Sequence, residues 1–226
     1  MKRLTILTGI LLTIFLVQSA MAGDYSLRGK TKLELDITAR DYSQKLDYLD
    51  PYDRDNSFDD GQISFGVSHF TTENSAVTFM ITAAEVSSDR YYDDYGSFTL
   101  RSSIVPIFWG SRFYMTDHNG YSPVKPYLAI SGGPVLGVNN YKSLGGSDVL
   151  LEDDVYLAFG AYFGGGIDFM FGENMMLGIN GGYNAFSDFK EYIGERDNYS
   201  GAELGISFGF LFGGPSHYDR DYDKPT

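Results

Sequence analysis

The sequence predicts an all-β fold: a closed, eight-stranded, antiparallel up-and-down barrel that crosses a membrane with its strands. Three observations lead to this prediction. Apolar and polar residues alternate with a period of two in eight segments, which is the pattern of strands with one face on each side. No segment after the N-terminus has 18 consecutive apolar residues, so helical spans are not expected. The links between the segments alternate between short and long.

The first 22 residues have the pattern of a cleaved export signal. Lys2 and Arg3 are followed by the apolar stretch 4–17 and by small residues that end at Ala22. Fourteen residues rise only about 21 Å as a helix, which is short of the ~30 Å hydrocarbon core of a bilayer. We therefore expect a signal peptide at 1–22, a barrel at 23–213 and an acidic periplasmic tail at 214–226.

Composition narrows the class of protein further. Without the signal, 15 basic residues stand against 30 acidic ones, and this acidic balance argues against binding to nucleic acid. The chain has no Cys, so disulfides cannot hold it together. It is rich in Gly, Tyr and Phe, with 27, 18 and 17 residues respectively. An exported, aromatic chain of this kind is typical of a strand-based membrane protein.

Alternation is clearest between Asp154 and Gly172, where odd positions are apolar and even positions are small or polar, apart from Met170. Such a length exceeds the five or six residues of an average strand. In the segment 97–116 the apolar positions change parity, so we expect a β-bulge between Ser102 and Pro106. The predicted strands are 32–40, 62–70, 77–84, 97–116, 125–138, 154–172, 175–188 and 201–212.

The links between these strands predict the orientation of the barrel. Links 71–76, 117–124 and 172–174 are short, whereas 41–61, 85–96, 139–153 and 189–200 are longer and rich in Asp, Tyr and Ser. Short periplasmic turns and longer extracellular loops are typical of outer-membrane barrels. An even number of strands also allows closure, which satisfies every backbone group in lipid. We therefore expect the cell outer membrane as the location.

Two stretches carry a resemblance to a known family. The run 104–115, IVPIFWGSRFYM, and the run 123–134, PVKPYLAISGGP, are similar to the fourth and fifth strands of the small outer-membrane barrel superfamily of OmpX, OmpW and the OmpA membrane domain. The last strand resembles the signal recognised by the barrel-assembly machinery. Its matching residues are Glu203, Gly205, Phe208 and Phe210. The resemblance implies an eight-stranded barrel and, as partners, the assembly machinery and the lipid and lipopolysaccharide of the outer membrane.

Polar residues that face the predicted interior are the candidate site. They are Lys32, Glu34, Asp36, Arg40, Arg101, Arg112, Asp168, Asn180, Asn184 and Glu203. Eight strands leave an interior that side chains can fill, so we expect charge clusters that plug the lumen, with Arg112–Asp168 and Arg40–Glu203 as pairs. This predicts a structural or surface-interaction role. The alternative is a passive channel for small solutes, as the OmpW resemblance would imply.

An enzyme that modifies lipid A is a third and weaker hypothesis. His69 and His118 are expected near the periplasmic rim and His217 in the tail, so no His is expected at the extracellular end. We find no nucleophile and base at a supporting spacing, and we expect neither a cofactor nor a metal. The Asp-rich loop 41–60 lacks the Gly and Glu of a calcium loop, although its Tyr residues leave a surface ligand possible.

Overall fold

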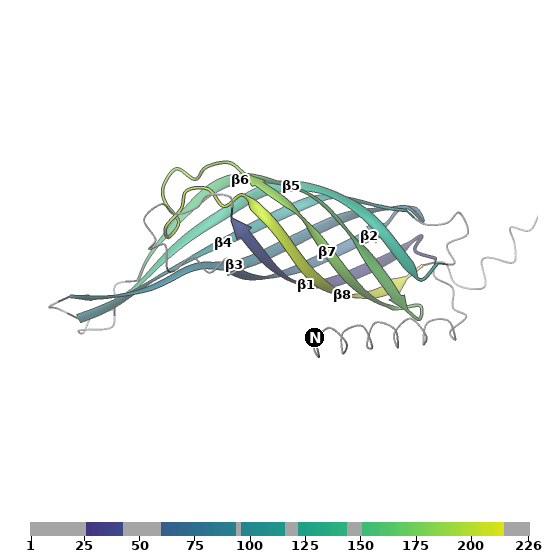
Figure 1. Cartoon of the computed structure of the whole chain (residues 1–226), viewed down its shortest axis with the longest axis horizontal. Coiled ribbons are helices and arrows are strands. Elements are labelled where there is room, and N and C mark those ends of the chain that lie inside the picture. Colours follow the sequence, from purple (N-terminus) through teal and green to yellow (C-terminus); the bar gives the residue numbers. More distant parts are fainter. Residues whose placement is uncertain (1–25, 43–59, 94–95, 116–121, 144–150, 215–226) are drawn as a thin grey trace, which may run out of the picture.

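The chain folds as a closed barrel of eight strands in which each strand runs antiparallel to its neighbours (Figure 1). The structure, a computed structural model, describes residues 26–42, 60–93, 96–115, 122–143 and 151–214. The expected signal peptide, the tail from 215 onward and most of the loop 41–60 lie outside these ranges, as do His118 and His217. In the part of the chain that is described, no helix has the length and hydropathy to cross a membrane.

The eight strands follow one another around the wall in chain order. They are β1 (Lys30–Tyr42), β2 (Asp60–Phe70), β3 (Ser75–Asp93), β4 (Gly96–Tyr114), β5 (Val124–Ser143), β6 (Leu151–Phe171), β7 (Met175–Phe186) and β8 (Gly201–Gly213). The wall closes where β1 pairs with β8. The predicted strand number, order and closure are confirmed.

Alternation along the strands assigns the two faces of the wall as the sequence predicts. On β6 the odd positions Phe159 and Phe163 are exposed on the outside, and the even positions Tyr162 and Asp168 are buried inside. Met170, the apolar exception on the inner face, is fully buried near the end of β6. The barrel is therefore inverted relative to a water-soluble one, with charge inside and large apolar side chains outside.

The strands are staggered by ten residues around the barrel. From Thr38 on β1, the ladder through β2, β3, β4 and β5 reaches Tyr156 on β6. From the same Thr38, the ladder through β8 and β7 reaches Gly166 on β6, ten residues away. Closure with this stagger requires tilted strands, typically by about 35–45°. Each row of paired residues therefore climbs obliquely along the barrel.

Links 71–74, 115–123 and 172–174 join the strands at one end, which we call the turn end, and the opposite end is the loop end. The β6–β7 turn begins at Gly172, whose φ of +64° is a left-handed conformation that glycine adopts without strain. The N-terminal segment 26–29 and the last strand also end here. The predicted alternation of short and long links holds only in part, because the β3–β4 link at the loop end comprises only positions 94–95 and the β4–β5 link at the turn end comprises 115–123.

Parts of two predicted long loops are instead strand. β3 and β4 remain paired up to Asp93 and Gly96, and β5 and β6 up to Lys142 and Leu151. Both hairpins extend beyond the closed wall, and Figure 1 shows the β3–β4 hairpin projecting farthest. The prediction of loops at 85–96 and 139–153 is therefore wrong for positions 85–93, 96, 139–143 and 151–153, and the remaining positions lie outside the described residues. The apolar alternation stops at polar residues, whereas the backbone pairing continues through them.

The predicted bulge between Ser102 and Pro106 is also wrong. The register of β4 with β5 is continuous there, and Ile104 and Phe108 are both buried inside the barrel. The register shift lies on the neighbouring strand, between Glu85 and Ser87 of β3. The prediction assumed that every apolar residue of β4 faces outward. Near the loop end, however, apolar side chains such as Ile104 and Phe108 also line the interior, so the change between even and odd apolar positions does not mark a bulge.

Candidate functional site: the barrel interior

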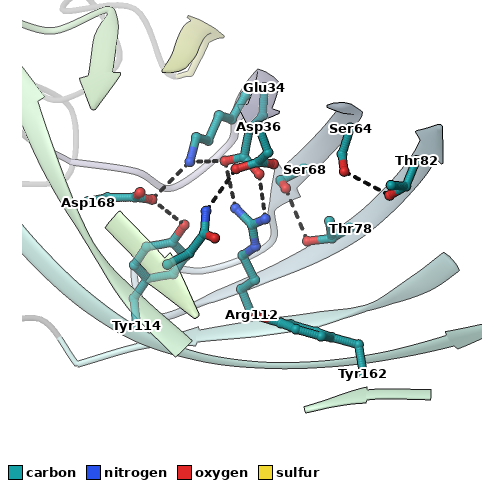
Figure 2. Close-up of polar contacts among 12 residues, drawn as sticks. Glu34, Asp36, Ser64, Ser68, Thr78, Thr82, Arg112, Tyr114, Tyr162 and Asp168 are labelled. Atoms are coloured by element: carbon teal, nitrogen blue, oxygen red, sulfur yellow. Dashed lines mark hydrogen bonds and ion pairs between the residues drawn. The ribbon is translucent and has the colours of Figure 1, made fainter. Parts of the chain in front are cut away.

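Near the turn end, the interior holds a buried ion-pair network between β1, β4 and β6 (Figure 2). Arg112 Nη1 on β4 donates to Glu34 Oε2 on β1 at 2.7 Å, and Arg112 Nη2 also contacts the Glu34 carboxylate. Lys32 Nζ lies 2.9 Å from Asp168 Oδ2 and contacts Glu34 as well. Tyr114 donates its hydroxyl to Asp168 Oδ2 at 2.9 Å. Two carboxylates and two cations thus pair with one another inside the barrel.

Polar pairs continue the filling of the interior around this network. Asn180 Nδ2 on β7 donates to Asp36 Oδ1 on β1 at 2.9 Å. Hydroxyl pairs join β2 to β3 on their inner faces: Ser64–Thr82 at 2.8 Å and Ser68–Thr78 at 3.0 Å. The Arg112 guanidinium also lies over the ring of Tyr127, 5.1 Å from its centroid. The hydroxyl pairs and the ring contact join neighbouring strands, and the Asn180–Asp36 hydrogen bond joins the two strands on either side of β8.

A second cluster lies closer to the loop end, around Glu203 of β8. Glu203 Oε2 accepts hydrogen bonds from Arg40 Nη2 at 2.8 Å, Gln62 Nε2 at 2.8 Å and Asn184 Nδ2 at 2.6 Å. The donors come from β1, β2 and β7, so one carboxylate holds four strands together. The ring of Phe186 lies under the Arg40 guanidinium, 5.4 Å away at its centroid.

Between the two clusters lies a small cavity with a volume of about 30 Å³. Asp36, Thr38 and Arg40 line it, and each has at least one buried polar atom without a protein partner. A water molecule needs roughly 10–15 Å³ measured in this way, so the cavity has room for about two waters. It is large enough to hydrate these groups but too small for a solute.

Apolar side chains seal the turn end. Leu27, in the segment before β1, is fully buried. The Glu73 carboxylate in the β2–β3 turn holds this segment by accepting hydrogen bonds from Ser26 Oγ at 2.5 Å and from the Leu27 amide at 2.8 Å. The buried side chains at this end are Leu27, Phe70, Ala76, Met170, Met176 and Leu211.

The loop end is covered by the β7–β8 link, residues 187–200, which we call the cap loop. Its side chains Phe189, Ile193 and Tyr199 are buried. Ile193 packs on Gly137 of β5, where a Cβ atom would lie only 2.5 Å from Ile193 Cγ1. Glycine is therefore required at 137 to make room for the loop.

Asn139 of β5 anchors the cap loop by its side-chain amide. Its Nδ2 donates to the Tyr192 carbonyl at 2.9 Å, and its Oδ1 accepts from the Gly194 amide at 3.0 Å. Ser102 Oγ on β4 donates to the same Oδ1 at 2.7 Å. Tyr199 makes an edge contact with Tyr42 at the top of β1. The sequence analysis gave no signal for this cap, because the loop has no period that would mark its buried residues.

The structure places most of the predicted interior residues together, with two corrections. Arg40 pairs with Glu203, as closure of β1 on β8 requires. Arg112 does not pair with Asp168 but with Glu34, and Asp168 binds Lys32 and Tyr114. The prediction paired β4 with β6 across one intervening strand and ignored that Glu34 on β1 reaches Arg112 on β4 across the narrow interior.

Arg101 is the second correction. It was expected inside, but it is exposed, on the opposite face of β4 from the buried Ser102 and Arg112. The error follows from the incorrectly predicted bulge, which would turn the odd positions before Ser102 toward the interior. Lys125 was missed: it is fully buried, opposite Asp168 in the ladder.

The remaining sequence candidates occupy other places. Phe208 and Phe210 of the expected assembly signal lie on the outer face of β8, each 47% exposed. His69 lies on the outside of β2 near the turn end, with Nδ1 3.1 Å from Thr31 Oγ1. Among the described residues, no group of three or more His, Cys, Asp or Glu side chains is placed to hold a metal ion.

Comparisons with known proteins add likenesses of architecture. No family model and no curated protein matches the sequence. The structure is similar to that of Ail, the attachment invasion locus protein of Yersinia pestis, determined in complex with the heparin analogue sucrose octasulfate, with a TM-score of 0.48 and 14% identity over 82% of this chain and 99% of that one. It is also similar to OprG from Pseudomonas aeruginosa, with a TM-score of 0.45 and 12% identity over 85% of this chain and 100% of that one.

A third similar structure is Neisserial surface protein A, with a TM-score of 0.43 and 15% identity over 81% of this chain and 96% of that one. Likenesses of this size do not extend to binding or activity. The function is therefore argued from the residues of this chain. The eight-stranded barrel that the sequence resemblance implied is the fold of this protein.

Proposed function

We propose that the protein is an outer-membrane barrel whose interior is closed and whose wall is a scaffold for the surface hairpins and loops. Its outer face supports the membrane location. On β8, alternate side chains from Leu204 to Phe212 are exposed and apolar. They cover eight residue steps, about 26 Å along the strand at ~3.3 Å per residue. At a tilt of about 40° this is roughly 20 Å along the axis, close to the ~25 Å apolar band of such barrels.

The same band continues around the described wall. Every strand contributes at least two large apolar side chains that are more than a third exposed, such as Leu33 and Ile37 on β1 or Leu177 and Ile179 on β7. A water-soluble protein rarely exposes an apolar surface of this extent, because hydrating it is unfavourable. A hydrocarbon layer around the barrel removes this cost, and the closed ladder satisfies the backbone inside it.

The observation that favours a scaffold over a channel is the ion-pair network Lys32, Glu34, Arg112 and Asp168. These four side chains span the interior and leave no exposed surface above 6% on any of them. The apolar seal at the turn end and the cap loop at the loop end lie below and above the network. A passive channel would need a continuous hydrated path, whereas the cavity between the clusters has a volume of only about 30 Å³.

The enzyme hypothesis gains no support from the described residues. A lipid-modifying site needs its chemical groups at the outer leaflet, whereas His69 lies near the turn end, on the outer face. The scaffold hypothesis places function on the loop end, where the two projecting hairpins and the cap loop would meet a surface ligand.

Two measurements on the mature chain test this proposal. A closed barrel should resist denaturation in detergent until it is boiled, so unheated and boiled samples should migrate differently in a gel; identical migration would contradict a closed barrel. In planar bilayers the folded protein should give negligible conductance. Steady conductance whose ion selectivity changes in Arg112→Ala, with stability retained, would establish the channel instead.

A further inference from the structure

One row of paired residues crosses four strands near the loop end. Its outward side chains are polar on β3 and β4 and apolar on β5 and β6. Glu85 on β3 pairs with Ser103 on β4, Ser103 pairs with Val138 on β5, and Val138 pairs with Val155 on β6. All four side chains are on the outer face. The first two are polar and the last two are apolar, so the outer surface is divided into two halves at the same level of the ladder.

The apolar half lies on a part of β6 that has no paired neighbour on its far side. The last β6–β7 pair is Gly160 with Phe186, whereas β6 continues to Leu151 in the ladder with β5. Val155 and Leu157 therefore belong to a sheet that extends above the closed wall. They are 61% and 56% exposed, similar to Phe163 at 65% within the closed wall.

Within the part of the chain that the structure describes, side chains cover the inner face of this extension and none covers its outer face. On the inner side, Ile193 of the cap loop packs on Gly137, and Tyr156 is packed against the buried core. On the outer side, Leu136 pairs with Leu157 and Val138 with Val155, which makes a continuous apolar surface. It ends one outward position higher, where Arg101 pairs with Asn140.

The apolar surface is continuous with the band that faces lipid in the proposed function. Phe159 and Phe163 lie below Leu157 on the same face of β6, 62% and 65% exposed. From Phe163 to Leu157 the strand advances six residues, about 20 Å at ~3.3 Å per residue. On the β3–β4 side, the outward positions of the same row are already polar. The border of the apolar band is therefore oblique and higher at β5–β6.

We propose that the outer face of β5–β6 above the closed wall, formed by Leu136, Val138, Val155 and Leu157, binds the lipid of the outer leaflet. This inference rests on the proposed membrane location. Lipid is the occupant because the surface continues the lipid-facing band without a polar break below it, and because apolar area gains about 25 cal/mol per Å² when it leaves water. The barrel consequently sits tilted, with its β5–β6 side deeper in the bilayer.

Because the chain has no Cys, single-cysteine variants can test this directly. Leu157→Cys, Ser103→Cys and Phe163→Cys are each labelled with an environment-sensitive fluorophore and folded into phosphatidylcholine vesicles. Brominated phospholipid quenches labels in the hydrocarbon, and iodide quenches labels in water. Heat-dependent gel migration verifies that each variant is folded. Ser103 and Leu157 form a matched pair because both face outward in neighbouring outward-facing rows of the ladder. Ser103 lies on the polar β3–β4 side and Leu157 on the apolar β5–β6 side.

At Leu157 we expect loss of fluorescence with brominated lipid as large as at Phe163, and protection from iodide, whereas Ser103 should show the reverse. Quenching of Leu157 by iodide as strong as that of Ser103 would overturn the inference. Protection of Leu157 from both quenchers would also overturn it, because a second copy or another protein would then cover the surface. If Phe163 itself is quenched by iodide and not by lipid, the membrane location fails, and the two failures are thereby distinguished.

Discussion

Glu34 on β1 binds the guanidinium group of Arg112 from across the barrel, with both terminal nitrogens of the arginine directed at its carboxylate. Both side chains are buried, and Glu34 also contacts Lys32. Bidentate pairing of this kind is the strong form of a charge-assisted hydrogen bond. The pair joins strands that are not neighbours, so it stabilises the closed barrel rather than one hairpin.

Arg112→Ala should therefore destabilise the barrel by about 3–5 kcal/mol, because the buried Glu34 carboxylate loses its bidentate partner and keeps only Lys32, which also pairs with Asp168. Urea unfolding in detergent, followed by gel migration, measures the change. Arg101→Ala is the matched control: this arginine is exposed on the same strand, and its loss should change stability by about 0–1 kcal/mol. Similar effects of the two substitutions would show that the network does not hold the barrel together.

Replacement of an outward side chain by arginine tests the facing of the strands. Ile206 is 57% exposed and pairs with Ile37 and Ile179 on either side. Ile206→Arg should cost about 2–4 kcal/mol in vesicles, because the charge would lie in hydrocarbon. Glu191→Arg, at an exposed position of the cap loop, should cost little. If both substitutions are tolerated equally, β8 does not face lipid.

Alternation was enough to predict the fold because a buried inner face and an exposed apolar outer face leave a period of two along the strands. The Arg40–Glu203 pair followed from closure alone, since β1 and β8 become neighbours and these residues are ladder partners. Such a contact needs only strand order and register.

Arg112 shows where that reasoning stops. Its partner Glu34 lies on a strand that is distant in the ladder, and only the stagger of ten residues brings the two to one height. The cap loop is harder to predict, because Ile193 packs into space that is free only where Gly137 has no side chain. Nothing in the local sequence of the loop indicates this contact.

The aromatic residues of the last strand should matter for assembly. Phe210→Ala removes an outward aromatic from the expected signal Glu203, Gly205, Phe208 and Phe210. We expect the purified assembly machinery to accelerate folding of this variant less than it accelerates the parent. Phe163→Ala, an equally outward aromatic on β6, is the control and should retain the full acceleration. Equal acceleration of both variants would remove the assembly role of Phe210.

The cap loop should open when its buried anchor is shortened. Ile193→Ala removes apolar contacts that are worth at least about 2 kcal/mol in a packed site. Since ~1.4 kcal/mol is a factor of ten, the open population should rise roughly 30-fold. Trypsin can report this opening, because Lys190 and Arg196 lie within the loop, and cleavage there should accelerate while the barrel stays folded.

Tyr192→Ala is the matched control, since Tyr192 is 60% exposed and contributes its backbone carbonyl to Asn139. Cleavage of Ile193→Ala at the rate of Tyr192→Ala would mean that Ile193 does not hold the cap in place.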